Sequence, residues 1–116
     1  MKNKLKKIIK NEKGTIRYEV AQDCLNDTED SYSIKDWFND LLSHGCQSGM
    51  IGHLIYYDDT HKFYDKYYDE IEEIRQELED SLGQALNPEG DLKNWYAWLG
   101  YEETARKIAE ELGLEV

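Results

Sequence analysis

The sequence lacks several features that would point to a membrane or secreted protein. It contains one proline and no low-complexity tract. No apolar run approaches the roughly 18 residues that a membrane-spanning helix needs, and residues 2–11 lack the apolar core of a signal peptide. The two cysteines, Cys24 and Cys46, are far apart and form no CxxC pair, so we expect reduced thiols. We therefore expect a soluble cytoplasmic protein.

Motifs of enzyme active sites are also missing. The chain has no glycine-rich phosphate loop, and pairs of carboxylates are too common among its 25 acidic residues to mark a catalytic centre. Cys46 activated by a nearby histidine would be a nucleophile, but no oxyanion-type loop or local signature accompanies it. We expect an activity based on binding, with no catalytic residue and no cofactor.

The histidines form the one cluster that could hold a metal. His44, Cys46, His53 and His61 follow the spacing H-x-C-x6-H-x7-H. Structural zinc sites usually take their four ligands as two close pairs, and only His44 and Cys46 are close in sequence. The pattern favours a structural role, in which the cysteine fills an apolar slot and the histidines bond at helix ends. A small metal-binding protein remains an alternative.

Charge is distributed very unevenly along the chain. Residues 1–17 contain seven basic residues and one acidic residue, a net charge of +6. The other 99 residues contain seven basic and 24 acidic residues, a net charge of −17. This contrast predicts a basic amphipathic arm or helix over residues 1–14 and an acidic helical domain over residues 15–116. The acidic part repels nucleic acid and anionic membranes and attracts basic proteins, and we expect the arm to lie on it.

Apolar residues recur at helical spacing along the whole chain, and one domain is expected from its 116 residues. Ser33 is a predicted N-cap for the helix that follows it. Gly113 is expected to end the last helix, with Leu114 folding back as in a Schellman motif. The fold class is all-α, a single compact domain of five or six helices with an aromatic-rich core. The expected helices cover residues 2–13, 15–27, 34–44, 49–57, 58–82 and 92–112.

The predicted helix over residues 58–82 has the highest density of acidic residues. Its apolar positions are Tyr64, Tyr67, Tyr68, Ile71, Ile74, Leu78 and Leu82. Ten acids lie between Asp58 and Asp80 over about 34 Å of helix, close to the one phosphate per ~3.4 Å of a DNA strand. A solvated outer face is the ordinary interpretation of such a pattern. The candidate partner-binding residues are Asp65, Asp69, Glu72, Glu73, Glu77, Glu79 and Asp80.

Two blocks carry a family resemblance, DWFNDLLSHGCQSGMIGHLIYYDDTHKFYDKYYDEIEEI and DLKNWYAWLGYEETARKIAEELGL. Over residues 35–114 the chain resembles a group of small uncharacterised acidic proteins of phages and mobile elements of Gram-positive and gut bacteria. These are similar in kind to anti-CRISPR and antirestriction proteins, several of which imitate DNA in a basic channel of a defence nuclease. The resemblance implies a host bacterial cytoplasm as the site of action and carries over no functional residue.

These observations favour one function and leave others open. We expect a phage or mobile-element inhibitor of the anti-CRISPR type, a DNA mimic whose acidic surface fills a basic DNA- or PAM-binding groove. The expected partner is a basic nucleic-acid-binding protein, foremost a CRISPR effector nuclease. The alternative is a homodimeric structural or regulatory module that uses surface aromatic residues, namely Trp95, Tyr96, Trp98 and Tyr101. The metal-binding protein is the second alternative.

Overall fold

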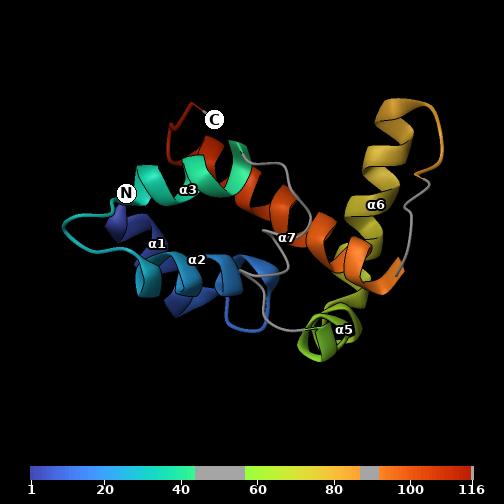
Figure 1. Ribbon diagram of the computed structural model, residues 1–116, viewed down its shortest axis with the longest axis horizontal. Coiled ribbons are helices and arrows are strands. Elements are labelled where there is room, and N and C mark those ends of the chain that lie inside the picture. The colour runs from blue at the N-terminus through green and yellow to red at the C-terminus, as the bar shows by residue number, and fades with distance from the viewer. Residues whose placement is uncertain (44–56, 87–91, 116) are drawn as a thin grey trace. The chain divides into compact units, whose positions relative to one another are not determined.

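The fold of the chain is all-α, as the sequence predicted. The computed structural model describes residues 1–43, 57–86 and 92–115. These residues form six helices (Figure 1), which are α1 (Lys2–Asn11), α2 (Ile16–Asp27), α3 (Ile34–Ser43), α5 (Tyr57–Lys66), α6 (Tyr68–Leu82) and α7 (Leu92–Glu111). Apart from one isolated bridge between Glu29 and Tyr32, the described residues contain no β-structure. Among these helices, none combines the length and apolar character needed to cross a bilayer.

The contacts divide the chain into two compact units. The first unit comprises Met1–Gly45 and Thr104–Val116, and the second comprises Cys46–Glu103. The first unit therefore contains α1, α2, α3 and the C-terminal part of α7. The second contains α5, α6 and the N-terminal part of α7.

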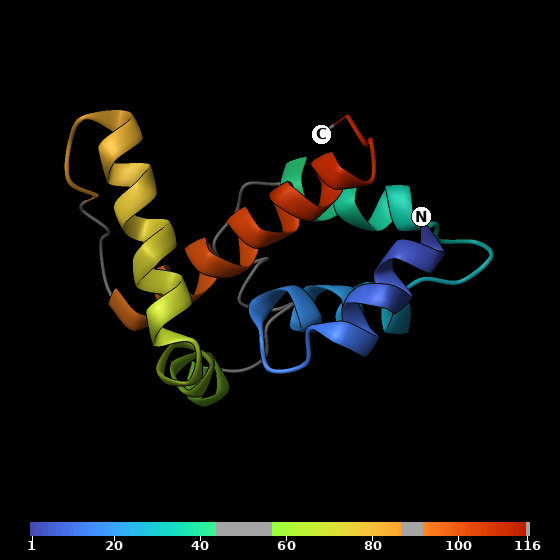
Figure 2. The ribbon, with the colours of Figure 1, turned by 180° about the vertical axis from the view of Figure 1, so that it is seen from behind.

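The first unit is built on helix packing between neighbours in sequence. Helix α1 packs against α2, and α2 packs against α3; α1 and α2 lie side by side in blue in Figure 2. Leu5 of α1 is fully buried, and so are Val20 and Cys24 of α2. The basic N-terminal segment is thus an ordered helix with its own share of the core, because its apolar residues recur on one face.

Local capping residues set the ends of these helices. The Thr15 hydroxyl accepts a hydrogen bond from the Tyr18 backbone N–H at 3.2 Å and so caps the start of α2. Ser33 accepts from the Asp36 N–H at 3.1 Å, which confirms the predicted N-cap of α3. Trp37, fully buried in α3, donates from its indole Nε1 to Asp27 at 3.1 Å. Short-range polar contacts therefore mark where α2 and α3 begin.

The last helix ends in the predicted Schellman motif. Gly113 has φ 77° and donates its N–H to the carbonyl of Glu110 at 3.0 Å. Leu114 donates to the carbonyl of Ala109, also at 3.0 Å. This pair of bonds satisfies carbonyls at the end of α7. Gly113 has a left-handed backbone conformation, which glycine adopts without strain.

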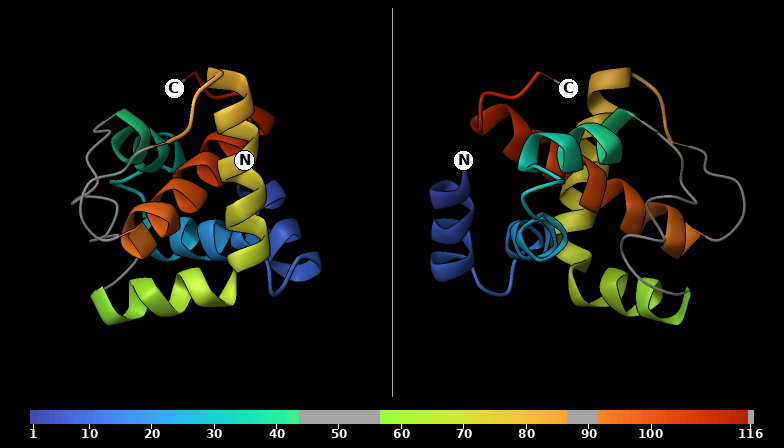
Figure 3. Two further views of the ribbon diagram at one scale, coloured as in Figure 1. Left: turned by 90° about the vertical axis from the view of Figure 1, so that its right-hand side faces the viewer. Right: turned by 60° about the vertical axis from the view of Figure 1, so that its left-hand side comes forward.

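The prediction of one long helix over residues 58–82 is wrong. The chain forms two helices there, α5 and α6, separated at Tyr67 with φ −112° and ψ 28°. Figure 3 shows α5 and α6 (green and yellow) running in different directions. Tyr67 is 3% exposed and its ring lies 4.8 Å from that of Phe63. Neither proline nor glycine is at the break, so burial of the aromatic rings is what turns the chain. The longest described helix is α7.

This break changes which side chains of α6 face the core. Ile71 and Ile74 are buried as predicted, whereas Tyr68 is 52% exposed and Leu82 is 57% exposed, contrary to prediction. Tyr68 directly follows the break, whereas Leu82 is the last residue of α6. Because α6 starts afresh after Tyr67, its apolar stripe does not continue that of α5.

The second unit has the expected aromatic core. The ring of Phe63 lies 6.1 Å from that of Tyr101, and the rings of Trp95 and Trp98 are 4.8 Å apart. Tyr101 is fully buried and Trp98 nearly so. Two of the four aromatic residues that the homodimeric module would place on its surface are therefore part of the interior. Leu92, at the start of α7, is exposed instead.

Candidate functional site: the acidic face of α6

Four acidic side chains share the outer side of α6. Counting 100° per residue, Asp69, Glu73, Glu77 and Asp80 fall within about 80° of arc, away from the buried Ile71 and Ile74. All four are exposed. We call this set the acidic face.

The acidic face contains no basic residue. From Asp69 to Asp80 it extends about 16 Å along the helix axis, at ~1.5 Å per residue, and the only base of α6 is Arg75. Arg75 falls on a different side of the helix. Each acid has a like charge three or four residues away, a spacing that destabilises a helix by about 0.2–0.5 kcal/mol per pair. The sequence thus retains an arrangement that helix stability alone disfavours.

Glu72 and Glu79, also predicted as site residues, are held by Arg75. Arg75 donates from Nε to Glu72 and from Nη1 to Glu79, at 2.6 Å in each case. Hydrogen bonds from Arg75 to Glu72 and Glu79 raise the pKa of the Arg75 guanidinium and keep it charged. Glu79 also accepts from the Leu86 N–H at 3.2 Å, and the bonds from Arg75 and Leu86 lower its pKa. These two carboxylates support the helix more than they present charge to a partner.

An aromatic group completes this support. The Tyr64 hydroxyl donates to Glu72 at 2.9 Å, and burial together with that bond raises the pKa of Tyr64 to about 12. The Arg75 guanidinium lies 5.8 Å from the centre of the Tyr96 ring, which stacks on Tyr64 with centroids 6.2 Å apart. Side chains of α5, α6 and α7 therefore meet around one arginine, and they fix the orientation of α6 within the second unit.

Asp65, another predicted site residue, lies on α5 and not on α6. Its side chain is 62% exposed and forms an ion pair with Lys93 at 3.2 Å. The break at Tyr67 removes Asp65 from the helix that bears the acidic face. Lys93 also offsets the charge of Asp65.

Tyr68 is the residue that sequence reasoning missed. It immediately precedes Asp69 and is half exposed, with its ring edge-on to Tyr64 at 5.6 Å. Exposed tyrosine beside carboxylates is well suited to contact arginine, through its ring face and its hydroxyl. Tyr67 and Tyr68 fit the apolar stripe equally well, and nothing in the sequence shows which of them leaves the core.

The proposed metal cluster falls largely outside the described residues. His44, Cys46 and His53 lie there, and His61 alone is described, half-buried on α5. Within the described part of the chain, no group of three His, Cys, Asp or Glu side chains could hold a metal ion. Cys24 is fully buried, and burial, with Asp27 and Asp23 nearby, raises its pKa to about 12.

The comparison with protein families identifies relatives of the whole chain. A family model described as "Domain of unknown function (DUF7222)" matches residues 2–114. The chain belongs to this family. The DUF7222 match includes the basic N-terminal helix, which the resemblance over residues 35–114 had left outside. No curated protein and no solved structure matches the chain.

Proposed function

We propose that the protein is an inhibitor of the anti-CRISPR type, made by a phage or mobile element to block a host defence nuclease. Its acidic face would occupy a basic DNA- or PAM-binding groove of the target. The observation that carries this proposal is the row of four exposed carboxylates on α6 without an intervening base. Such a surface is complementary to a groove built for phosphates.

The spacing of the carboxylates can be compared with the spacing of phosphates along a DNA strand. Four acids over about 16 Å give one per ~5.5 Å of axis, against one phosphate per ~3.4 Å for a strand of B-DNA. The acidic face therefore resembles DNA in the sign of its charge, at a lower charge density than that of a DNA strand. Arginine side chains of the target can adapt to such a spacing, because each pairs with one carboxylate independently.

Support for the proposal also comes from the rigidity of the helix. The bonds of Arg75 to Glu72 and Glu79 hold the flank of α6, so the outer carboxylates are presented on an ordered scaffold. A preordered surface loses less conformational entropy on binding. Tyr68 lies at one end of the acidic face and supplies the aromatic contact area that binding hot spots favour.

Inhibition of DNA cleavage tests this function directly. Purified protein is added to a panel of CRISPR effector nucleases, and cleavage is compared for the wild type and the variant D69N/E73Q/E77Q/D80N. The wild type should inhibit a member of the panel, less strongly as salt rises, and the variant should lose inhibition. Glu72 is left intact because its loss would break the bonds to Tyr64 and Arg75.

A matched control separates the effect of the acidic face on inhibition from the effect of the overall net charge. The variant E29Q/D30N/E110Q/E115Q removes the same number of exposed acids from the first unit. It should inhibit as well as the wild type. Equal loss in both variants would reduce the effect to overall charge, and full inhibition by the α6 variant would place the binding surface elsewhere. A wild type that inhibits no effector of the panel would contradict the anti-CRISPR assignment.

A further inference from the structure

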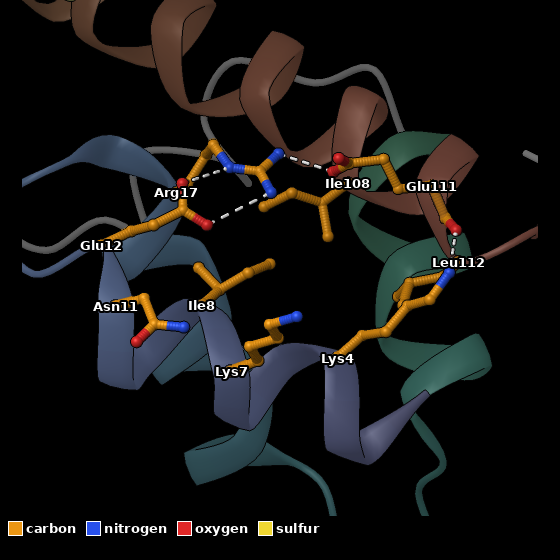
Figure 4. A pocket seen from close by; sticks show the side chains of 9 residues that line it. All are labelled: Lys4, Lys7, Ile8, Asn11, Glu12, Arg17, Ile108, Glu111 and Leu112. Carbon is orange, nitrogen blue, oxygen red and sulfur yellow. Dashed lines mark hydrogen bonds and ion pairs between the residues drawn. The ribbon is translucent and has the colours of Figure 1, made fainter.

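A hollow of about 410 Å³ lies in the first unit, where the faces of α1 and the start of α2 meet the end of α7 (Figure 4). Its volume is at the lower end of the range typical of small-molecule sites. The hollow belongs to the first unit and is independent of the acidic face of α6. We call it the α1–α7 pocket. Its lining residues are Lys4, Lys7, Ile8, Asn11, Glu12, Arg17, Ile108, Glu111 and Leu112.

Arg17 forms a fixed wall of the pocket. Its Nε donates to Glu12 at 2.8 Å and its Nη1 to Glu111 at 2.5 Å, so it joins segments 94 residues apart in sequence. Burial lowers the pKa of Arg17, but the hydrogen bonds that Arg17 donates to Glu111 and Glu12 outweigh this effect and raise the pKa overall. Because Glu12 and Glu111 offset the positive charge of Arg17, this guanidinium offers little attraction to a further anion.

The lysines of the pocket are placed differently. Lys4 donates from Nζ to the backbone carbonyl of Glu111 at 2.8 Å, at the end of α7 where the helix dipole is negative. Lys7 is exposed and, among the described residues, takes part in no ion pair. Figure 4 shows the Lys7 side chain extending between Ile8 and Lys4. The described residues that line the pocket include three cations and two carboxylates, a net charge of +1 in a chain of net charge −11.

The remaining lining restricts the chemistry of the ligand. Ile8, Ile108 and Leu112 give the pocket an aliphatic floor, and the Asn11 amide stands at its rim. Among the described residues the lining contains no aromatic ring on which a nucleobase or sugar could stack. A net charge of +1 matches one carboxylate, and the floor matches a short saturated carbon chain.

We propose that the α1–α7 pocket binds a small aliphatic monocarboxylate. The carboxylate lies against the ammonium groups of Lys7 and Lys4, and the carbon chain lies on Ile8, Ile108 and Leu112. Binding links α1 to the end of α7, the same two segments that Arg17 and Lys4 already join. The site takes its ligand whether or not the acidic face binds a nuclease.

Hexanoate is a suitable probe, with two partial analogues as comparisons. Backbone amide chemical shifts of the full chain are followed by NMR during titration with hexanoate, with acetate and with hexan-1-ol. Hexanoate should give saturable shifts in α1 and at the end of α7. Acetate lacks the chain and hexan-1-ol lacks the charge, so each should bind at least about fivefold more weakly.

A matched pair of lysine variants assigns the carboxylate to Lys7. Lys7→Gln should weaken hexanoate binding about fivefold, the effect of losing one partly exposed charge-assisted bond. Lys6→Gln removes an exposed lysine of the same helix that does not line the pocket, and should leave the affinity unchanged. Both positions are exposed, and the dispersion of the NMR spectrum verifies folding.

Three results would overturn the proposal. The first is the absence of saturable shifts in these segments at millimolar hexanoate. The second is hexan-1-ol binding as tightly as hexanoate, which would make the pocket an apolar hollow without anion selectivity. The third is an equal affinity for the wild type and Lys7→Gln.

Discussion

At the scale of single residues, Arg75 decides which carboxylates of α6 remain available. By bonding Glu72 and Glu79 it turns two of the seven candidate site residues into supports. The other acids of α6 that were candidates, the four of the acidic face, are exposed. A one-residue change at position 75 should therefore affect stability and its dependence on pH together.

The pH dependence follows from the lowered pKa of Glu79. A carboxylate with a pKa below its ordinary value of 4.5 contributes stability that is present above pH 4.5 and is lost as pH falls through its folded pKa. Arg75→Met removes the bond that is the main cause of the shift. The variant should unfold at lower urea than the wild type at pH 7, and this difference should shrink at acidic pH. Urea denaturation at pH 7 and below pH 4 measures both effects.

Lys6→Met serves as the control for this comparison, because it removes an exposed cation with no role in the Arg75 network. It should leave the pH profile as in the wild type. A constant difference between Arg75→Met and wild type at all pH values would show that the bond to Glu79 is not the source of the dependence.

Cys24 gives a second prediction at the residue scale. A pKa of about 12 in place of 9.0 lowers the thiolate fraction near pH 8 about 1000-fold, and the side chain is fully buried. In a Cys46→Ser variant, Cys24 should react with a thiol reagent very slowly in buffer and quickly in urea. Mass spectrometry against time follows the reaction. Rapid labelling of the folded protein would mean that Cys24 is accessible.

At the scale of helices, short-range groups account for the element ends that were predicted correctly. Ser33 caps α3, and Gly113 with Leu114 closes α7. These features depend on residues within five positions of one another, so they are visible in the sequence. The break at Tyr67 depends on the burial of rings against α7 and leaves no comparable local mark.

The cap of α3 can be tested by truncation. Ser33→Ala removes the acceptor of the Asp36 N–H and should lower the free energy of unfolding by about 1 kcal/mol. Ser81→Ala, at an exposed interior position of α6, should be neutral or slightly stabilising because alanine has the higher helix propensity. Thermal or urea unfolding of both variants measures the difference. Equal effects would show that Ser33 acts as an ordinary surface serine.

At the scale of the whole molecule, charge differs between the two units. The basic N-terminal region in the first unit is partly neutralised, and α6 in the second unit is acidic and exposed. Lys4 and Arg17 of the basic N-terminal region bond to Glu111 within the first unit. The second unit carries the acidic face without such compensation from a base of α6.

This arrangement predicts a conflict between stability and binding. The variant D69N/E73Q/E77Q/D80N removes five like-charge pairs of α6 at helical spacing and should raise the free energy of unfolding by at least about 1 kcal/mol at low salt. The gain should fade as salt screens the repulsion in the wild type. Urea denaturation at low and high salt measures it. Loss of stability on neutralisation would show that the four carboxylates make stabilising contacts.

Sequence alone determined the helical class, the capped start of α3, the glycine-closed end of α7, and the high acidity of the segment that contains α6. Those properties arise from composition and from contacts within about one turn of the chain. Tertiary structure decided that Tyr67 is buried and Tyr68 is not, that Arg75 takes Glu72 and Glu79, and that Arg17 meets Glu111. Each of these outcomes depends on which distant side chains share a limited space, and spacing along one chain does not contain that information.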